Sequence, residues 1–415
     1  MNALPSAIEG RLSWIDGGGL LSVPGWRGAV MNTGVKQSGQ LDLAILSCDE
    51  PRPAAGVFTR CELPAAPVVI GRESLHEEPL VRTIAINAGN ANAMTGERGI
   101  SDARIMRDRV AEQFGGPALV LSTGIIGVPL PLNRILCGID AAAGTLRAEC
   151  DEIADAIMTT DTTRKACAVR VDLPEHSGRA ASTLIVGGLA KGSGMIHPNM
   201  ATMLSVVAFD QPMESSTLRG VLKRAVDRSF HEITVDGDTS TNDTVLLVAG
   251  HTSANAPIAE GDPWLPEIER AVGAVMERLA RAIVEDGEGR TRIMEVLVEG
   301  AADEASARAV ADSMARSSLV KTALTGGDPN WGRLLAAAGN AGVVLKPERA
   351  TLEICDILVF EDGGPSDYNA HALGAAFSAS EVRVRLNLGQ GSGQARKLTS
   401  DLSVDYVRAN SEYTT

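Results

Sequence analysis

The chain has 415 residues, of which 44% are hydrophobic, and its net charge is −14. An acidic surface argues against a protein that wraps a nucleic-acid phosphate backbone, although a few local basic groups still allow an anionic substrate. No apolar run approaches the ~20 residues that span a bilayer, and the first residues do not resemble a signal peptide, so we expect a cytoplasmic protein without membrane contact.

Short apolar runs in the first third of the chain predict strands at residues 41–46, 83–87 and 118–122. A helix is predicted through residues 104–114, with Ser101 as its N-cap and Asp102 in its first turn.

Farther along the chain, two more strands are predicted at residues 184–189 and 203–208. The clearest helix covers residues 266–284, and a second covers 303–316. Near the end, residues 382–388 alternate apolar and polar, which predicts a strand with one buried face. The apolar positions of the clearest helix recur every three or four residues and form one stripe: Ile268, Val272, Val275, Leu279 and Ile283.

Strands and helices are mixed without the βαβ rhythm of a nucleotide-binding fold and without internal repeats. Length alone suggests two or three domains, but one large mixed sheet would also use this many residues. The segments at 175–178 and 362–366 are expected to be surface turns rather than domain boundaries.

None of the six cysteines forms a CxxC pair or stands at zinc-ligand spacing from a histidine. We therefore expect reduced thiols and no metal site.

The most unusual segment is KGSGMIHPNMATML, residues 191–204, which lies between two predicted strands. Its residues alone favour an ordinary tight turn, since KGSG lacks the spacing of a phosphate-binding loop. They are also compatible with self-cleavage before Thr202. The Thr202 hydroxyl would attack the carbonyl of Ala201, and the α-amine that is freed, with a pKa of ~8, would then serve as the base for the hydroxyl.

This segment closely resembles the self-cleavage motif of the ornithine acetyltransferase family, also called bifunctional glutamate N-acetyltransferase. The resemblance extends over essentially the whole chain, because further segments follow in the family's order. They are GVFTR (56–60), NAGNAN (87–92), LSTGIIG (121–127), MTTDT (158–162), DGDTSTNDT (236–244), EDGEG (285–289), DPNWGR (328–333) and NSEYTT (410–415).

The resemblance implies a role for each matching residue. Thr202 is the nucleophile, the bond between Ala201 and Thr202 is cleaved, and Thr123 and Gly124 form the oxyanion hole. A glycine N–H and a threonine hydroxyl are suitable donors for such a hole. Lys191 would pair with a substrate carboxylate and Glu288 with an ammonium group. The implied substrate-binding set is Thr159, Thr160, Lys191, Thr202, Glu288, Asn410 and Thr415.

The implied fold is a layered α/β architecture of mixed sheets flanked by helices, shared with self-cleaving aminopeptidases. Residues 1–201 would form an α-chain and residues 202–415 a β-chain, with one shared core and an α2β2 assembly. The implied reaction moves an acetyl group from N2-acetylornithine to glutamate, in arginine biosynthesis, through an acetyl-Thr202 ester. It needs no metal or redox cofactor, and acetyl-CoA is a second candidate donor.

Three positions depart from the family's common pattern: His197, the strand after Leu204, and Arg290 with Arg292. They concern the choice of acyl donor and acceptor. Three alternatives therefore stay open: a self-cleaving aminopeptidase or amidase, an N-acyltransferase of specialised metabolism acting on another basic amino acid, and a binding protein without enzymatic activity. The resemblance also implies a docked C-terminal tail, in which Val407 and Tyr413 are expected to pack as anchors.

Overall fold

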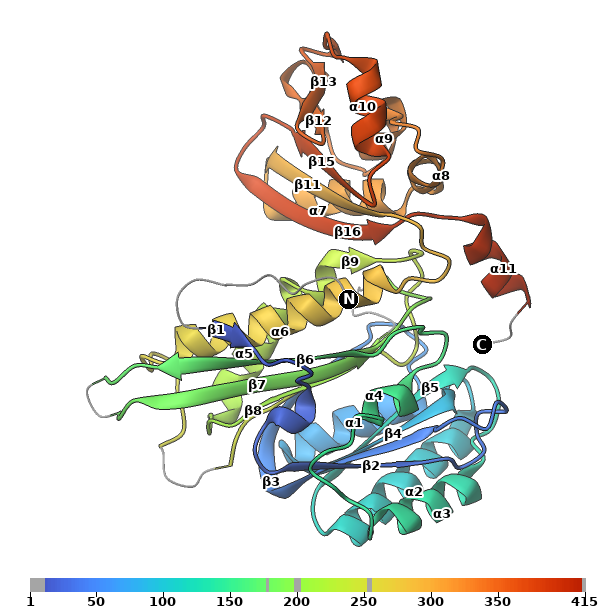
Figure 1. Cartoon of the computed structure of the whole chain (residues 1–415), viewed down its shortest axis with the longest axis vertical. Coiled ribbons are helices and arrows are strands. Elements are labelled where there is room, and N and C mark those ends of the chain that lie inside the picture. Colours follow the sequence, from blue (N-terminus) through green and yellow to red (C-terminus); the bar gives the residue numbers. More distant parts are fainter. Residues whose placement is uncertain (1–11, 177–178, 198–202, 252–255, 413–415) are drawn as a thin grey trace.

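The computed structural model describes residues 12–176, 179–197, 203–251 and 256–412. Its strands form one sheet of nine strands and one of seven, in the lower and upper parts of Figure 1. The first sheet contains β1 (Leu12–Trp14), β2 (Trp26–Met31), β3 (Leu43–Phe58), β4 (Leu80–Asn90), β5 (Ala118–Ile125), β6 (Lys165–Leu173), β7 (Ser182–Lys191), β8 (Leu204–Phe209) and β10 (Thr244–Val248). The second contains β9 (Ile233–Thr234), β11 (Ile293–Ala301), β12 (Thr351–Ile354), β13 (Ile357–Glu361), β14 (Gly364–Pro365), β15 (Glu381–Asn387) and β16 (Gly393–Ser400).

The nine-stranded sheet folds back on itself at β3. The first part of β3 pairs with β2 and β4, whereas its last residues, 54–58, pair with β10. A register shift between Ser47 and Arg52 marks the change of direction, since an irregular pairing bends a strand. The two halves face each other, so that Leu46 and Ile84 of one half join Leu189 and Val206 of the other in one core.

Helices cover the two outer faces of this folded sheet (Figure 1). On one side, α6 (Leu265–Glu285) packs on β6, β7 and β8, and α5 (Ser215–Asp227) packs beside it on β10 and β3. On the other side, α2 (Gly96–Phe114) and α3 (Leu132–Ala142) pack on β2 to β5. The remaining helices of this part are α1 (Ala66–Glu77), α4 (Ile153–Ile157), η1 (Leu20–Ser22) and η2 (Phe230–Glu232). The predicted α/β class with layered mixed sheets and flanking helices is confirmed.

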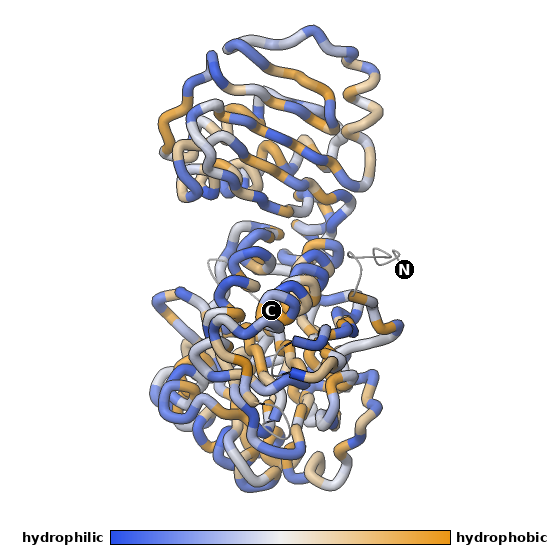
Figure 2. The backbone as a smooth tube through the Cα atoms, turned by 90° about the vertical axis from the view of Figure 1, so that its left-hand side faces the viewer, coloured by the Kyte–Doolittle hydropathy of each residue, from blue (hydrophilic) through white to orange (hydrophobic). Residues whose placement is uncertain are grey.

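The seven-stranded sheet has a hydrophobic core of its own, built from residues 294–388. Along β15, Val382, Val384 and Leu386 are buried while the residues between them are exposed. This confirms the predicted alternation, which is visible as changing colours along the upper strands of Figure 2. The helices of this part are α7 (Glu304–Arg316), α8 (Ser318–Gly326), α9 (Trp331–Gly339), α10 (Ala370–Phe377) and η3 (Pro347–Arg349), and α11 (Val404–Glu412) follows β16.

The helices predicted at 266–284 and 303–316 are confirmed as α6 and α7, and Asp303 caps α7 through a bond from the Ser306 N–H. The predicted start of α2 is wrong. That helix begins at Gly96, with Thr95 as N-cap, so Ser101 lies inside it. Gly96, Glu97 and Arg98 are exposed. Because this first turn buries little apolar surface, its sequence has no hydrophobic periodicity from which a helix start can be predicted.

Candidate active site

The segments with predicted site residues meet at one end of the folded sheet. Thr123 and Gly124 lie near the end of β5, and Lys191 is the last residue of β7. Leu204, the first residue of β8, pairs with Lys191 on one side and with Thr244 of β10 on the other. Ala201 and Thr202 themselves lie outside the described residues.

Lys191 is the centre of this cluster. Its Nζ donates to Thr159 Oγ1 at 2.8 Å and to Thr123 Oγ1 at 3.2 Å, with Asp161 Oδ2 3.9 Å away. Burial lowers the pKa of the Lys191 ammonium, against the charges of Asp161 and Glu288, which raise it. Because an ammonium only donates, Thr123 Oγ1 accepts here and its own O–H is left to donate to another group. This is the orientation that an oxyanion-hole hydroxyl needs.

Gly124 occupies a backbone position that excludes a side chain. Its φ of +125° lies in the region that favours glycine, and a Cβ added there would stand 2.3 Å from the carbonyl carbon of Gly89. The close approach of β4 and β5 at this point therefore requires glycine at position 124.

A buried ion cluster supports the loop that carries Thr159. Lys165 Nζ lies 2.7 Å from Asp161 Oδ1 and 2.5 Å from Asp286 Oδ2, and these side chains are almost fully buried. Asp161 also accepts the N–H groups of Thr159 and Gly192. Burial raises the pKa of Asp161, but the charges of Lys191 and Lys165 outweigh it and hold that pKa below its usual range. The cluster thus ties the Thr159 loop to β7. Thr160, the other predicted residue of this loop, is half-buried.

Glu288 and Asn410 come together from distant parts of the chain. Asn410 Nδ2 donates to Glu288 Oε2 at 2.8 Å. The Glu288 N–H donates to Ser193 O at 3.1 Å, and a Cβ on Gly194 would stand 2.3 Å from the Glu288 carboxyl carbon. The predicted pair of substrate-binding residues therefore lies against the KGSG turn, next to Lys191.

The anchor of the C-terminal segment differs from the predicted one. Val407 is 59% exposed, so its predicted packing is wrong, and Tyr413 and Thr415 lie outside the described residues. Instead, Ser403 Oγ donates to Gly289 O at 2.5 Å, and the Tyr406 hydroxyl lies 3.4 Å from Asp236 Oδ2. Polar contacts at the start of α11, rather than apolar packing, place Asn410.

The DGDTSTNDT segment joins the other motifs, a role that the sequence reasoning missed. Asn242 Nδ2 donates to Ala91 O at 2.7 Å and to Ser122 O at 2.8 Å, which links the NAGNAN and STG segments. Asp236 accepts from Met195 N at 2.6 Å and Ile196 N at 2.8 Å. Asp243 Oδ1 accepts from Met203 N at 3.0 Å. A polar run between apolar strands was the signal available in the sequence.

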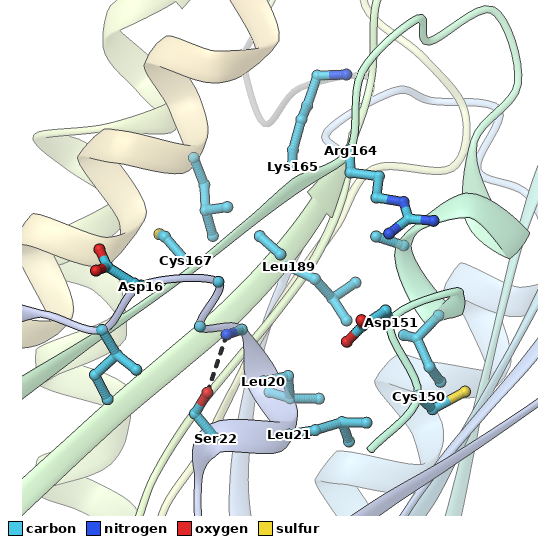
Figure 3. A pocket seen from close by; sticks show the side chains of 18 of the residues that line it. Asp16, Leu20, Leu21, Ser22, Cys150, Asp151, Arg164, Lys165, Cys167 and Leu189 are labelled. Carbon is cyan, nitrogen blue, oxygen red and sulfur yellow. Dashed lines mark hydrogen bonds between the residues drawn. The ribbon is translucent and has the colours of Figure 1, made fainter. Parts of the chain in front are cut away.

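Two open cavities of about 950 Å³ each have walls that include none of Thr123, Thr159 and Lys191. The first lies beside β6 and the glycine loop that precedes η1, and Figure 3 shows Lys165 turned away from Ser22 and that loop. The second lies beside α5, α7 and β16, and among the predicted positions of variation only His197 contributes to its wall. The predicted catalytic residues that the structure describes line neither cavity.

The described part of the chain contains no helix long and apolar enough to cross a membrane. Within the same ranges, no three or more His, Cys, Asp or Glu side chains are grouped to hold a metal ion. All six cysteines are free thiols, and burial raises the pKa of Cys48 to about 11.

Comparison with known proteins gives a consistent result. The ArgJ family matches residues 27–415. A protein of Gloeobacter violaceus named arginine biosynthesis bifunctional protein ArgJ is 43% identical over 97% of this chain and 99% of its own. A protein of the same name from Geobacter sulfurreducens is 42% identical over 95% of this chain and 100% of its own. Ornithine acetyltransferase from Mycobacterium tuberculosis has a solved structure in complex with ornithine. Its sequence is 35% identical over 45% of this chain and 98% of its own, and the TM-score is 0.40.

Proposed function

Because this chain belongs to the ArgJ family, we propose that it is an arginine-biosynthesis acyltransferase that cleaves itself between Ala201 and Thr202. Thr202 then transfers an acetyl group from N2-acetylornithine to glutamate. The observation that carries the proposal is the hydrogen-bonded cluster of Thr123, Thr159 and Lys191. This cluster lies where β8 begins, two residues after the proposed new N-terminus.

The reaction proceeds in two half-reactions. The Thr202 hydroxyl attacks the acetyl carbonyl of N2-acetylornithine, and the freed α-amine of Thr202 accepts the hydroxyl proton. Thr123 O–H and the Gly124 N–H donate to the tetrahedral oxyanion. The carbon–nitrogen bond then breaks, ornithine leaves with the proton on its amine, and an acetyl ester remains on Thr202. The amine of glutamate attacks this ester and restores the hydroxyl.

Lys191 has two tasks in this scheme. Two of its three N–H donors hold the hydroxyls of Thr123 and Thr159, and the third is available for a substrate carboxylate. Glu288, whose carboxylate accepts from Asn410, binds the ammonium group of the substrate. Thr160 and Thr415 complete the proposed binding set. Acetyl-CoA is a second candidate donor, and the scheme uses no metal or redox cofactor.

The two fragments, 1–201 and 202–415, stay together after cleavage. In support, β8 and β10 of the second fragment lie between β7 and β3 of the first, within one sheet. Separation would break main-chain pairing along β7, β8, β10 and β3 and expose the core between the two halves. We further propose an α2β2 assembly in the cytoplasm.

Intact mass spectrometry of the purified protein tests the cleavage. We expect two fragments, one of which begins at Thr202, and a single uncut and inactive chain for Thr202→Ala. Incubation with N2-acetylornithine and glutamate then tests the transfer, with N-acetylglutamate and free acetate measured separately. A wild-type chain that remains uncut while active contradicts the assignment of Thr202. Acetate without N-acetylglutamate would favour an amidase.

A further inference from the structure

The second of the two large cavities has a wall that is rich in positive charge, although the chain as a whole has a net charge of −14. It lies between α5 in the lower part of the molecule and α7 with β16 in the upper part (Figure 1). Its volume of about 950 Å³ suits a ligand of nucleotide size, since pockets for such molecules measure ~300–1,000 Å³. No described residue of the wall has a role in the scheme above. Besides Lys397, the wall contains six arginines: Arg60, Arg224, Arg228, Arg308, Arg316 and Arg396.

The carboxylates of the wall are too few to neutralise these cations. They are Asp227, Glu232, Glu304 and Asp312. Three of the arginines have a carboxylate close by, in the pairs Arg308 with Glu304, Arg396 with Glu232 and Arg224 with Glu269. Asp312 is shared, because Lys397 Nζ lies 3.2 Å from its Oδ1 and Arg316 Nη1 lies 3.5 Å from its Oδ2. One carboxylate therefore faces two positive charges.

Two further arginines, Arg60 and Arg228, have no ion-pair or hydrogen-bond partner for their guanidinium groups among the residues that the structure describes. The remaining acid of the wall, Asp227, is bonded to His231 at 2.8 Å instead. Burial lowers the pKa of His231, its bond to Asp227 raises it, and the positive charges of Lys397 and Arg60 lower it. The cavity thus holds an excess of positive charge, which its own acids leave without a counter-ion.

A small polyanion is the ligand that matches this wall. A guanidinium group binds two phosphate oxygens at once, and a diphosphate brings several negative charges, whereas a single carboxylate brings one. The described part of the wall contains no Phe, Tyr or Trp on which a base would stack, so recognition would depend on the phosphates. We propose that this cavity binds a ligand with a diphosphate group, through Arg60, Arg228 and Arg316. Free pyrophosphate and a nucleotide such as ADP or coenzyme A share this chemistry. The proposal does not depend on the chemistry of Thr202.

Calorimetric titration of the full chain with sodium pyrophosphate tests the proposal, with ADP, coenzyme A and adenosine titrated in parallel. We expect a Kd below about 1 mM for at least one of the three diphosphates at low salt, and weaker binding as salt screens the charges. Adenosine, which has no phosphate, should not bind. Equal affinities for the diphosphates would assign the site to the diphosphate group alone. An affinity for ADP or coenzyme A at least about tenfold above that for pyrophosphate would assign it to a nucleotide.

Variants of the wall separate a built site from general attraction. Arg60→Gln combined with Arg228→Gln removes two exposed cations that support no carboxylate, so the fold should be retained. We expect this pair to weaken diphosphate binding by about tenfold or more, because charge-assisted contacts are lost. Arg219→Gln is the matched control, since Arg219 is an exposed arginine of α5 outside the wall, and it should bind like the wild type.

Asp312→Asn acts in the opposite direction. It removes the carboxylate that faces Lys397 and Arg316, so it should tighten diphosphate binding by about threefold or more, a result that loss of structure would not produce. Four outcomes would overturn the proposal: no binding of any of the three diphosphates at low salt, adenosine binding as tight as that of ADP, an unchanged affinity in the Arg60 and Arg228 double variant, or weaker binding in Asp312→Asn.

Discussion

Replacing Thr123 with valine removes one proposed oxyanion donor and keeps the shape of the side chain. The hydroxyl is buried, with 9% of the residue exposed, so bulk water is not available to replace it as a donor. Loss of one donor of this kind lowers kcat by ~10²–10³, or about 2.7–4 kcal/mol of transition-state stabilisation. We expect a change of this size in acetyl transfer, with KM nearly unchanged because the oxyanion exists only in the transition state.

The same substitution should disturb folding less than catalysis. Lys191 loses one hydrogen bond but keeps Thr159 Oγ1 at 2.8 Å and the nearby charge of Asp161. A hydrogen bond that involves a charged group, here the Lys191 ammonium, contributes about 1.5–3 kcal/mol to the free energy of unfolding. The assay is therefore steady-state transfer from N2-acetylornithine to glutamate, together with urea unfolding of the same samples. Thr123→Ser, which keeps the hydroxyl, is the control. If Thr123→Val retains a kcat within about threefold of the wild type, Thr123 is a turn residue and the reasoning fails.

Three further predictions concern other parts of the molecule. Deletion of residues 410–415 should leave self-cleavage intact but raise KM for N2-acetylornithine by about tenfold or more, because Glu288 loses its Asn410 partner. Unchanged steady-state kinetics would show that the C-terminal tail does not bind substrate. Gly124→Ala should lower the free energy of unfolding by more than about 1 kcal/mol, because the alanine Cβ would lie 2.3 Å from the carbonyl carbon of Gly89. An unchanged midpoint of urea unfolding would contradict this close approach. Burial lowers the pKa of His197 to about 4, although the charge of Asp312 opposes this shift. The neutral imidazole therefore contributes stability above about pH 6.5, the pKa of histidine in the unfolded chain, and this contribution is lost as the pH falls toward 4. The thermal midpoint of the wild type should therefore fall more steeply over this range than that of His197→Gln, and parallel curves would show that His197 does not titrate there.

Local patterns in the sequence identified the elements that have one strongly apolar face. The stripe of α6 and the alternation of β15 report directly which side of each element is buried, so both were predicted closely. The start of α2 was predicted wrongly, because the first turn of that helix is largely exposed. The anchor of α11 was also wrong, because Tyr406 and Ser403 hold that helix through polar contacts, which leave no hydrophobic period in the sequence.

The sequence by itself determined the family and the order of its motifs, because each motif is a short run of residues that is recognisable without its surroundings. It also named Lys191, Thr123 and Glu288. Only the tertiary structure decided what these residues touch. Lys191 and Thr123 are 68 residues apart in the chain, and they meet because β3 bends and brings the two halves of its sheet face to face. The hydrogen bond from the Met203 N–H to Asp243 Oδ1, between residues 40 apart in the chain, arises in the same way. Burial and hydrogen-bond partners depend on which distant segments pack together, and no local period in a sequence records that packing.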